Sequence, residues 1–171
     1  TVPRDQYFYT GMDAYIHCLE AISGRYRNAV GDALSQQVLS LSEEVFLGGD
    51  MMREDAREKL MVASYLGGMA IAASYVGLVH PLSAGLSVVL GSHHCISNCI
   101  VMRAMREFYP KYYETFWEMA ERQSVEIPKN ICHGLGQDDF SKLYEASIVH
   151  TKPLTNALGQ EYKKILSKPF V

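Results

Sequence analysis

The chain has 171 residues, of which 48% are hydrophobic, and a formal net charge of −3 at pH 7, which fits one globular domain with a sizeable core. Acidic and basic residues are mixed along the sequence without a basic stripe, which argues against a nucleic-acid partner. The four cysteines are too few for a disulfide scaffold and no secretory signal precedes them, so we expect a cytoplasmic protein, and the start at Thr1 suggests a piece of a longer chain.

Three helices are predicted in the first half of the chain. The first runs from Thr10 to a stop at Ser23–Gly24, and the second runs from Asn28 to Gly48–Gly49 with apolar residues three and four positions apart. Asp50 is expected to cap a third, long helix that passes from a charged surface segment into the core and ends near Tyr75.

The segment between Lys59 and Arg103 contains no Asp, Glu, Lys or Arg, and it is long enough to span a membrane. Serine, glycine and proline interrupt this segment, and its histidines would be costly in hydrocarbon. We therefore expect a pair of buried helices and no membrane partner. Because Pro81 breaks the first helix of the pair, a loop or a helix start is predicted at residues 76–81.

Four further helices are predicted, at His94–Glu107, Tyr112–Gln123, Asp138–Val149 and Thr155–Leu166. The β-like stretch Leu86–Leu90 is too short to count as a strand, and no repeat or low-complexity segment occurs. The predicted fold is an all-α bundle of seven or so helices.

Two pairs of residues are candidate metal ligands. Asp13 and His17 lie four positions apart on an apolar helix, so both side chains project from one face. His80 stands beside the helix-breaking proline, and His94 follows in the same uncharged segment, where a buried imidazole needs a partner. A carboxylate with imidazoles suits zinc or ferrous iron. A shared divalent metal is one interpretation; the alternatives are a surface ion pair for Asp13 and His17 and satisfied core residues for the other histidines.

The cysteines offer two weaker alternatives. A structural zinc knot of His93, His94, Cys95 and Cys99 has poor spacing, because adjacent helix residues point about 100° apart and no CxxC pair occurs. Cys18 fails as a nucleophile activated by the histidine before it, since neighbouring helix residues do not face each other. We interpret all four cysteines as structural thiols.

Three segments resemble motifs of the iron-containing alcohol dehydrogenases. Thr10–Ala14 with His17 and Glu20 is similar to the TG(M/I)DAxxHxxE segment of that family. Gly77–His80 resembles its GLxH segment, and His94 with Asn98 resembles its HGxxN segment. The resemblance covers essentially the whole chain, as the helical C-terminal domain of the family.

The resemblance implies that residues 1–171 form a helical metal-binding domain and that the N-terminal dinucleotide-binding domain is absent; no GxGxxG motif occurs. It implies one catalytic divalent metal, iron or zinc, whose ligands are Asp13, His17, His80 and His94. His93 is a candidate to line the substrate pocket or relay a proton. In the full-length enzyme we expect NAD or NADP as cofactor and a homo-oligomer, and we expect this piece alone to be inactive.

The implied activity is oxidation of a primary alcohol by hydride transfer to a nicotinamide. Two positions depart from the family pattern: Ala84 replaces a frequent histidine near the substrate, and Cys95 replaces the glycine after the last ligand. The chain is most similar to the branch that oxidises the C8 hydroxyl of the sugar acid 3-deoxy-manno-octulosonate. Arg25 and Arg27 are candidates to pair with its carboxylate, although solvated loop residues are the simpler interpretation. A helical interaction module without metal and a metal-dependent hydrolase are the alternatives from other classes.

Overall fold

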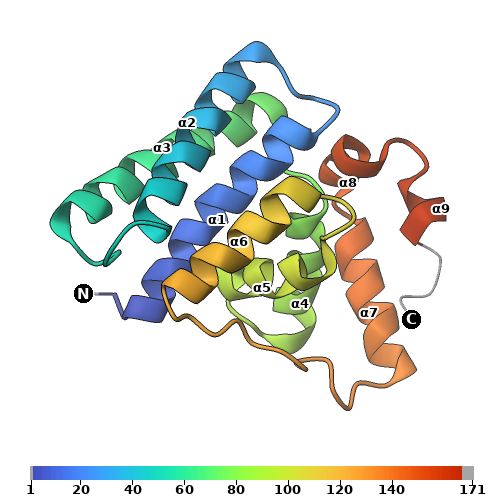
Figure 1. The fold of residues 1–171 in the computed structure, drawn as a ribbon. Coiled ribbons are helices and arrows are strands. Elements are labelled where there is room, and N and C mark those ends of the chain that lie inside the picture. The colour runs from blue at the N-terminus through green and yellow to red at the C-terminus, as the bar shows by residue number, and fades with distance from the viewer. Residues whose placement is uncertain (1, 167–171) are drawn as a thin grey trace.

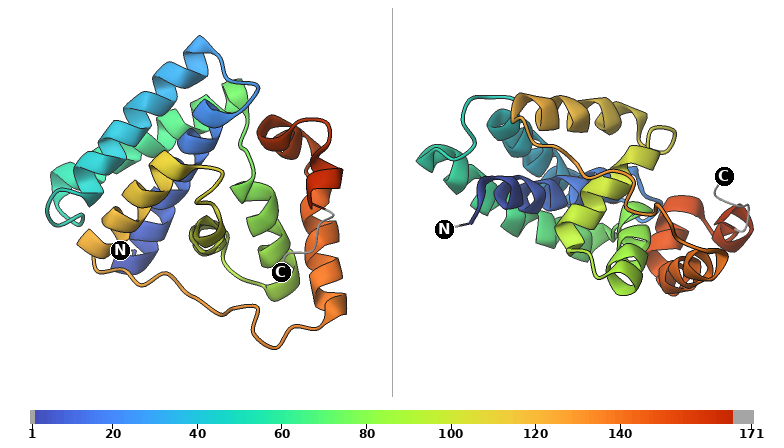
Figure 2. Two further views of the ribbon diagram at one scale, coloured as in Figure 1. Left: turned by 45° about the vertical axis from the view of Figure 1, so that its right-hand side comes forward. Right: turned by 90° about the horizontal axis from the view of Figure 1, so that it is seen from below.

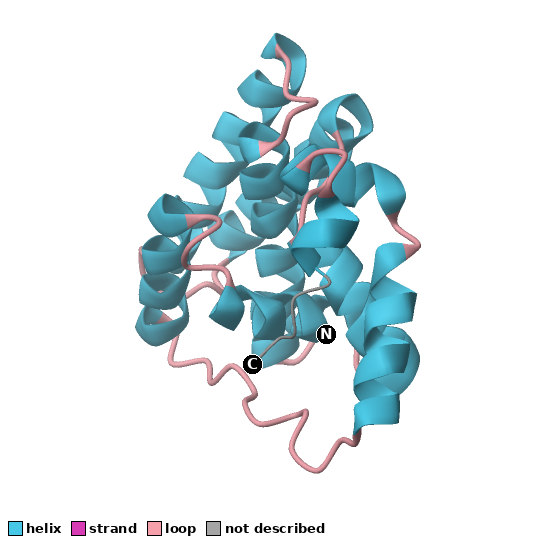
Figure 3. Cartoon of the chain, turned by 90° about the vertical axis from the view of Figure 1, so that its right-hand side faces the viewer, coloured by secondary structure: helices cyan, strands magenta, loops and turns pink. Residues whose placement is uncertain are grey.

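The computed structural model describes residues 2–166, and these residues form helices joined by loops, with no strand among them (Figures 1 and 3). The all-α prediction is confirmed. The helices, in chain order, are α1 (Arg4–Ser23), α2 (Ala29–Phe46), α3 (Glu54–Ser74), α4 (Val79–Leu90), α5 (His94–Val101), the short 3₁₀ helix η1 (Met102–Ala104), α6 (Pro110–Arg122), α7 (Gln137–Ile148), α8 (Thr151–Leu158) and α9 (Tyr162–Leu166).

The predicted starts of α1 and α3 were wrong, and the reason is local. Helix α1 begins at Arg4, six residues before Thr10, whose hydroxyl donates to the Gln6 carbonyl inside the helix instead of capping it. Helix α3 begins at Glu54, because Asp50 accepts from the Met52 N–H in the turn that precedes the helix. The start of α2 agrees with the prediction, since the Asn28 side chain caps it by accepting from Gly31 N–H.

The segment after α3 forms helix α4, which was predicted only as a loop or helix start. Pro81 lies in the first turn of α4, where its missing N–H leaves no hydrogen bond unmade. The β-like stretch Leu86–Leu90 is helical. The helix predicted from His94 ends at Val101 instead of Glu107, and the last predicted helix is divided into α8 and α9 at Gly159, whose φ is +78°.

Helix α1 is the centre of the fold. It packs against α2 and α3 on one side and against α5 on another, while α4 joins α5 to α7 (Figures 1 and 2). Phe8, Met12 and Tyr15 of α1 are fully buried, and the Phe8 ring meets Phe46 of α2 edge to face at a centroid distance of 5.1 Å. Side chains on α1 are therefore held by a packed helix rather than by a loop.

The prediction that both uncharged helices are buried was wrong for the outer face of α3. Met61, Val62, Tyr65 and Met69 are 72%, 51%, 71% and 44% exposed. Over residues 2–166, no single helix is long and apolar enough to cross a membrane; α3 and α4 meet the length and composition criteria only together, and they are bent by 107°.

Candidate metal centre

The first part of the site lies on α1. Asp13 and His17 are one helical turn apart, and Asp13 Oδ1 lies 3.8 Å from His17 Nε2. Both side chains are largely buried: 18% of the Asp13 side chain and 19% of the His17 side chain are exposed, and the neighbouring residues on α1 belong to the apolar core. The i,i+4 spacing that was apparent in the sequence therefore places both groups on one face of a packed helix.

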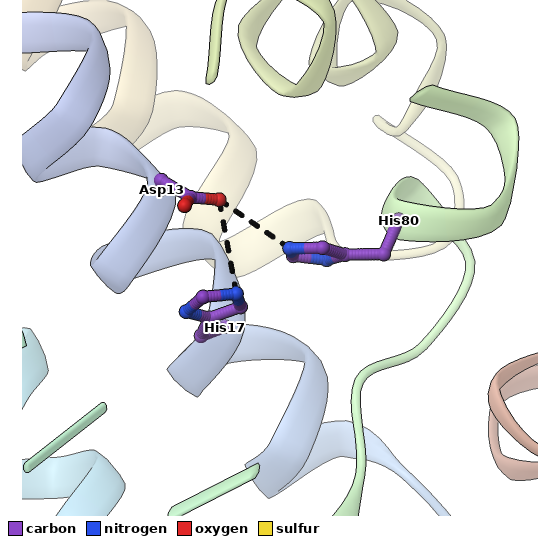
Figure 4. Close-up of side chains that lie close together, drawn as sticks. All are labelled: Asp13, His17 and His80. Atoms are coloured by element: carbon purple, nitrogen blue, oxygen red, sulfur yellow. Dashed lines mark ion pairs between the residues drawn. The ribbon is translucent and has the colours of Figure 1, made fainter. Parts of the chain in front are cut away.

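Helix α4 brings His80 to the same place. Asn156 of α8 donates to the carbonyls of Ser74 and Val76, which fixes the path of the segment that leads from α3 to α4. His80 Nε2 then lies 3.4 Å from Asp13 Oδ1, and its ring stacks on His17 with a centroid distance of 4.5 Å. Figure 4 shows the two histidines converging on the one carboxylate.

His94, the first residue of α5, completes the cluster on its open side. Its Nε2 lies 3.7 Å from the same Asp13 oxygen, and its ring centroid is 5.5 Å from that of His80. The His94 side chain is 45% exposed, whereas that of His80 is 11% exposed. The structure thus brings together all four predicted ligand residues and leaves the site open beside His94.

The geometry of the cluster fits a divalent cation. Ligand bonds of about 2.1 Å in a tetrahedral site place neighbouring ligand atoms about 3.4 Å apart, and the three imidazole nitrogens lie 3.4–3.8 Å from Asp13 Oδ1. The ligand atoms of Asp13, His17 and His80 all lie within 4.8 Å of one another. At 3.7–3.8 Å, His17 and His94 are too far from Asp13 for a direct hydrogen bond, so an ion between them would satisfy both.

Glu20 is a member of the site to which sequence reasoning gave no role. It is fully buried on α1, one Oε atom accepts from Val79 N–H, and the other hydrogen-bonds to His80 Nδ1. The available signal was a carboxylate three positions after His17 on an apolar helix, because a buried charge requires a partner.

Asn98 of α5 adds a buried amide beside the cluster. Its Nδ2 donates to Asp13 Oδ1 and lies 3.2 Å from His94 Nε2. Its Oδ1 is buried and has no hydrogen-bond partner among residues 2–166. The Cys95 thiol approaches the other Asp13 oxygen at 3.8 Å. Asn98 therefore turns its amide nitrogen toward the Asp13 carboxylate and the imidazoles, while its buried oxygen has no partner among the described residues.

The pKa values of three of the four proposed ligands, Asp13, His17 and His94, favour metal binding at neutral pH. Burial raises the pKa of Asp13, but the hydrogen bond with His80 and the positive charge that the three nearby histidines carry when protonated outweigh it and lower the pKa to about 2. Burial, with the charge of His80, lowers the pKa of His17 to about 4, and burial lowers that of His94. Asp13 is therefore ionised and these two imidazoles are neutral, as ligands must be.

His80 differs from the other two histidines. Burial opposes its charge, but the Glu20 and Asp13 carboxylates raise its pKa to about 9. In the metal-free protein His80 therefore carries a proton on each ring nitrogen, Nδ1 facing Glu20 and Nε2 facing Asp13. A cation bound at Nε2 would displace the proton on Nε2.

The other sequence candidates lie outside the cluster or at its edge. His93 is exposed at the N-cap of α5, beside the ligand cluster rather than within it. Among residues 2–166, the thiols of the zinc-knot alternative join no group of converging ligand atoms, and burial raises the pKa of Cys95 to about 11. Arg25 and Arg27 are exposed, and Arg27 pairs with Asp32 at 2.6 Å.

Comparison with known proteins identifies a family whose model matches most of this chain. The model described as "Fe-containing alcohol dehydrogenase family, C-terminal" matches residues 7–160. Methanol:N,N-dimethyl-4-nitrosoaniline oxidoreductase of Mycobacterium sp. (strain DSM 3803 / JC1) is 30% identical over 132 residues, which are 74% of this chain and 30% of that protein. The 1,3-propanediol dehydrogenase of Klebsiella pneumoniae is 33% identical over 98 residues, 54% of this chain and 24% of that protein.

Solved structures show the same fold. The iron-containing alcohol dehydrogenase of Thermococcus thioreducens superposes with a TM-score of 0.75 at 18% identity, covering 96% of this chain and 50% of that chain. The alcohol dehydrogenase of Oenococcus oeni gives a TM-score of 0.78 at 19% identity, with coverage of 96% and 51%. The chain thus spans about half the length of these structures and less than a third of the two curated relatives.

Proposed function

We propose that this chain, which belongs to the Fe-containing alcohol dehydrogenase family, supplies the metal-binding half of an active site that oxidises a primary alcohol. The observation that carries the proposal is the convergence of His17, His80 and His94 Nε2 on Asp13 Oδ1, at 3.4–3.8 Å. Together with the family's iron-containing name, this geometry favours an oxidoreductase over a metal-free interaction module or a metal-dependent hydrolase.

Asp13, His17, His80 and His94 are the proposed ligands of one divalent metal, iron or zinc. Such an ion would supply Lewis-acid polarisation of an alcohol hydroxyl, which lowers the pKa of that hydroxyl, and loss of its proton favours loss of hydride from the adjacent carbon. The ligands contribute one carboxylate charge and three neutral nitrogens, so a divalent ion together with these four ligands would carry one net positive charge. That charge matches the electron-rich oxygen of the substrate.

The exposed side of the cluster is the proposed route for substrate. His94 borders it with 45% of its side chain exposed, while the buried His80 closes the opposite side. His93 precedes His94 and is exposed, and we assign it to the wall of this opening, as a contact for substrate or a relay for the hydroxyl proton. Cys95, which stands where the family motif has glycine, places its thiol 3.8 Å from Asp13 Oδ2.

The hydride acceptor is proposed to be NAD or NADP, bound by a dinucleotide-binding domain of the full-length enzyme, with residues 1–171 acting as its helical metal-binding partner. The chain contains no GxGxxG sequence of its own. The nicotinamide would supply the acceptor for the hydride of the alcohol carbon, and His93 would lie beside the path by which the hydroxyl proton reaches solvent. This division of labour predicts that the chain on its own binds metal without turning over alcohol.

As the particular substrate we propose the C8 hydroxyl of 3-deoxy-manno-octulosonate, supported by the His93–Cys95 segment that departs from simple alcohol dehydrogenases. The carboxylate of such an acid would have to be bound by a group other than Arg27, because the Arg27 guanidinium is already paired with Asp32. Replacing Arg25 and Arg27 together with alanine should therefore leave the KM for the acid unchanged. A large increase in KM would assign these arginines to the substrate.

The proposed function is tested by removing metal from the full-length enzyme with a chelator and then adding back Fe²⁺ or Zn²⁺. NAD(P)-linked oxidation of primary alcohols should vanish and return, and Asp13→Asn and His17→Ala should bind no metal. His133→Ala, which alters an exposed turn histidine, is the matched control and should behave as wild type. Metal-independent turnover, or hydrolysis without reduction of the nicotinamide, would overturn the proposal.

A further inference from the structure

We propose that Glu20 is a positioning residue of the metal centre: it holds His80 with its proton on Nδ1, so that Nε2 is presented to the metal. This inference rests on the proposed function in one respect, namely that His80 is a metal ligand. Among residues 2–166, His80 is the one proposed ligand to which Glu20 is joined by a hydrogen bond or ion pair.

Both oxygens of Glu20 are committed to the first turn of α4. One accepts from the Val79 N–H and the other from His80 Nδ1. The Glu20 side chain is fully buried and that of His80 is 11% exposed, so water is not an alternative partner for the carboxylate. The two hydrogen bonds together fix both the position and the rotation of the carboxylate plane, and with it the plane of the His80 ring.

The chemistry of the carboxylate dictates which nitrogen of His80 is free. An ionised carboxylate accepts hydrogen bonds and cannot donate them, so Nδ1 must carry a proton. Nε2 then points at Asp13 Oδ1, 3.4 Å away, and offers its lone pair to an ion placed there. Helix α4 has no side-chain cap from its own N-cap residue, and its N-terminus favours the negative charge of Glu20.

Support of the α4 terminus can be tested separately from positioning of the His80 imidazole, because Tyr109 also supports that terminus, at Leu78. Its hydroxyl accepts from Leu78 N–H at 3.1 Å, next to the Glu20 bond to Val79. Tyr109 is also buried. It supports the same helix terminus through a backbone N–H and makes no hydrogen bond to His80, so Tyr109→Phe reports the effect of loosening α4 without changing the imidazole partner.

Glu20→Gln is the decisive substitution. A glutamine has one acceptor oxygen, so it satisfies Val79 N–H or His80 Nδ1–H, but not both. If its oxygen faces Val79, its NH₂ faces His80 Nδ1 and drives the proton to Nε2, which removes the ligand lone pair. We expect Zn²⁺ affinity, measured by competition with a chromophoric chelator, to fall about 10- to 100-fold.

The controls separate positioning from folding. Tyr109→Phe should lower the melting temperature and leave Zn²⁺ affinity within about twofold of wild type. In a His80→Ala background, Glu20→Gln should lower affinity no further, because its effect requires the imidazole. Equal affinity losses in Glu20→Gln and Tyr109→Phe, or an undiminished loss without His80, would overturn the inference.

If Glu20→Gln does not fold, the inference is tested on the zinc-loaded wild-type protein by nuclear magnetic resonance. Long-range ¹H–¹⁵N correlation should show a His80 Nδ1 proton that exchanges slowly with water, and a rapidly exchanging proton would contradict a buried carboxylate partner. The two proposals fail differently. If the wild-type protein binds neither Zn²⁺ nor Fe²⁺, the proposed function is contradicted. If a folded Glu20→Gln variant binds metal normally, only the proposed role of Glu20 is contradicted.

Discussion

Replacing His80 should destabilise the metal-free fold far more than replacing His94, although both are proposed ligands of the same ion. His80→Ala leaves the carboxylate of Glu20 fully buried with only the Val79 N–H as partner. Breaking a buried charge pair in this way costs about 3–5 kcal/mol. His94 is 45% exposed and its Nε2 stands 3.7 Å from Asp13, so His94→Ala should cost no more than about 1 kcal/mol.

The assay is urea unfolding with excess chelator present, followed by far-ultraviolet circular dichroism. With a urea m-value of about 2 kcal/mol/M, a difference of about 3 kcal/mol separates the midpoints of the two variants by about 1.5 M. Adding Glu20→Gln to His80→Ala should recover part of the loss, because the uncompensated charge is removed. Equal midpoints for His80→Ala and His94→Ala would refute the reasoning that the buried Glu20 carboxylate depends on His80 as its partner.

Three further predictions concern other parts of the structure. In Gly77→Ala the new Cβ would lie 2.6 Å from Tyr109 Oη and 3.2 Å from a Glu20 oxygen. Overpacking should therefore lower the free energy of unfolding by about 1–3 kcal/mol and weaken Zn²⁺ binding. A variant with wild-type stability and Zn²⁺ affinity would argue against the close packing at α4. Burial raises the pKa of the Cys18 thiol to about 12, so the folded state holds the thiol proton more tightly than the unfolded state. The contribution of this group to the free energy of unfolding is therefore full below about pH 9 and is lost as pH rises toward 12. Cys18→Ala should reduce the slope of unfolding free energy against pH between pH 9 and 11, and an unchanged slope would contradict the shift. Zn²⁺ at one hundred times its Kd should stabilise the wild-type fold by about 2.7 kcal/mol and Asp13→Asn hardly at all, which thermal unfolding of the two proteins would check.

The sequence predicted the long helices of this fold and the residues of the cluster, but not how the cluster is supported. The spacing of Asp13 and His17 places both on one helix face in any packed helix. That His80 and His94 join them depends on α4 and α5 packing beside α1, which spacing within the sequence does not contain. The family resemblance supplied that step.

The remaining failures have separate physical causes. Helix α4 was predicted only as a loop or helix start without bounds, because Pro81 was interpreted as a break, although proline is tolerated in a first helical turn. Glu20 received no role because its partners, Val79 and His80, are 59 and 60 residues away along the chain. The apolar face of α3 was placed in the core from composition, yet Met61 and Tyr65 are more than 70% exposed, because composition does not say which face of a helix finds a partner.

The central claim is that Asp13, His17, His80 and His94 bind one divalent metal. Its most direct test is anomalous diffraction at the metal absorption edge from crystals of the intact protein loaded with Zn²⁺ or Fe²⁺. We predict one peak, about 2.0–2.2 Å from an Asp13 oxygen and from the Nε2 atoms of the three histidines. No peak in this cluster, or one held instead by His93 with Cys95 and Cys99, would contradict it.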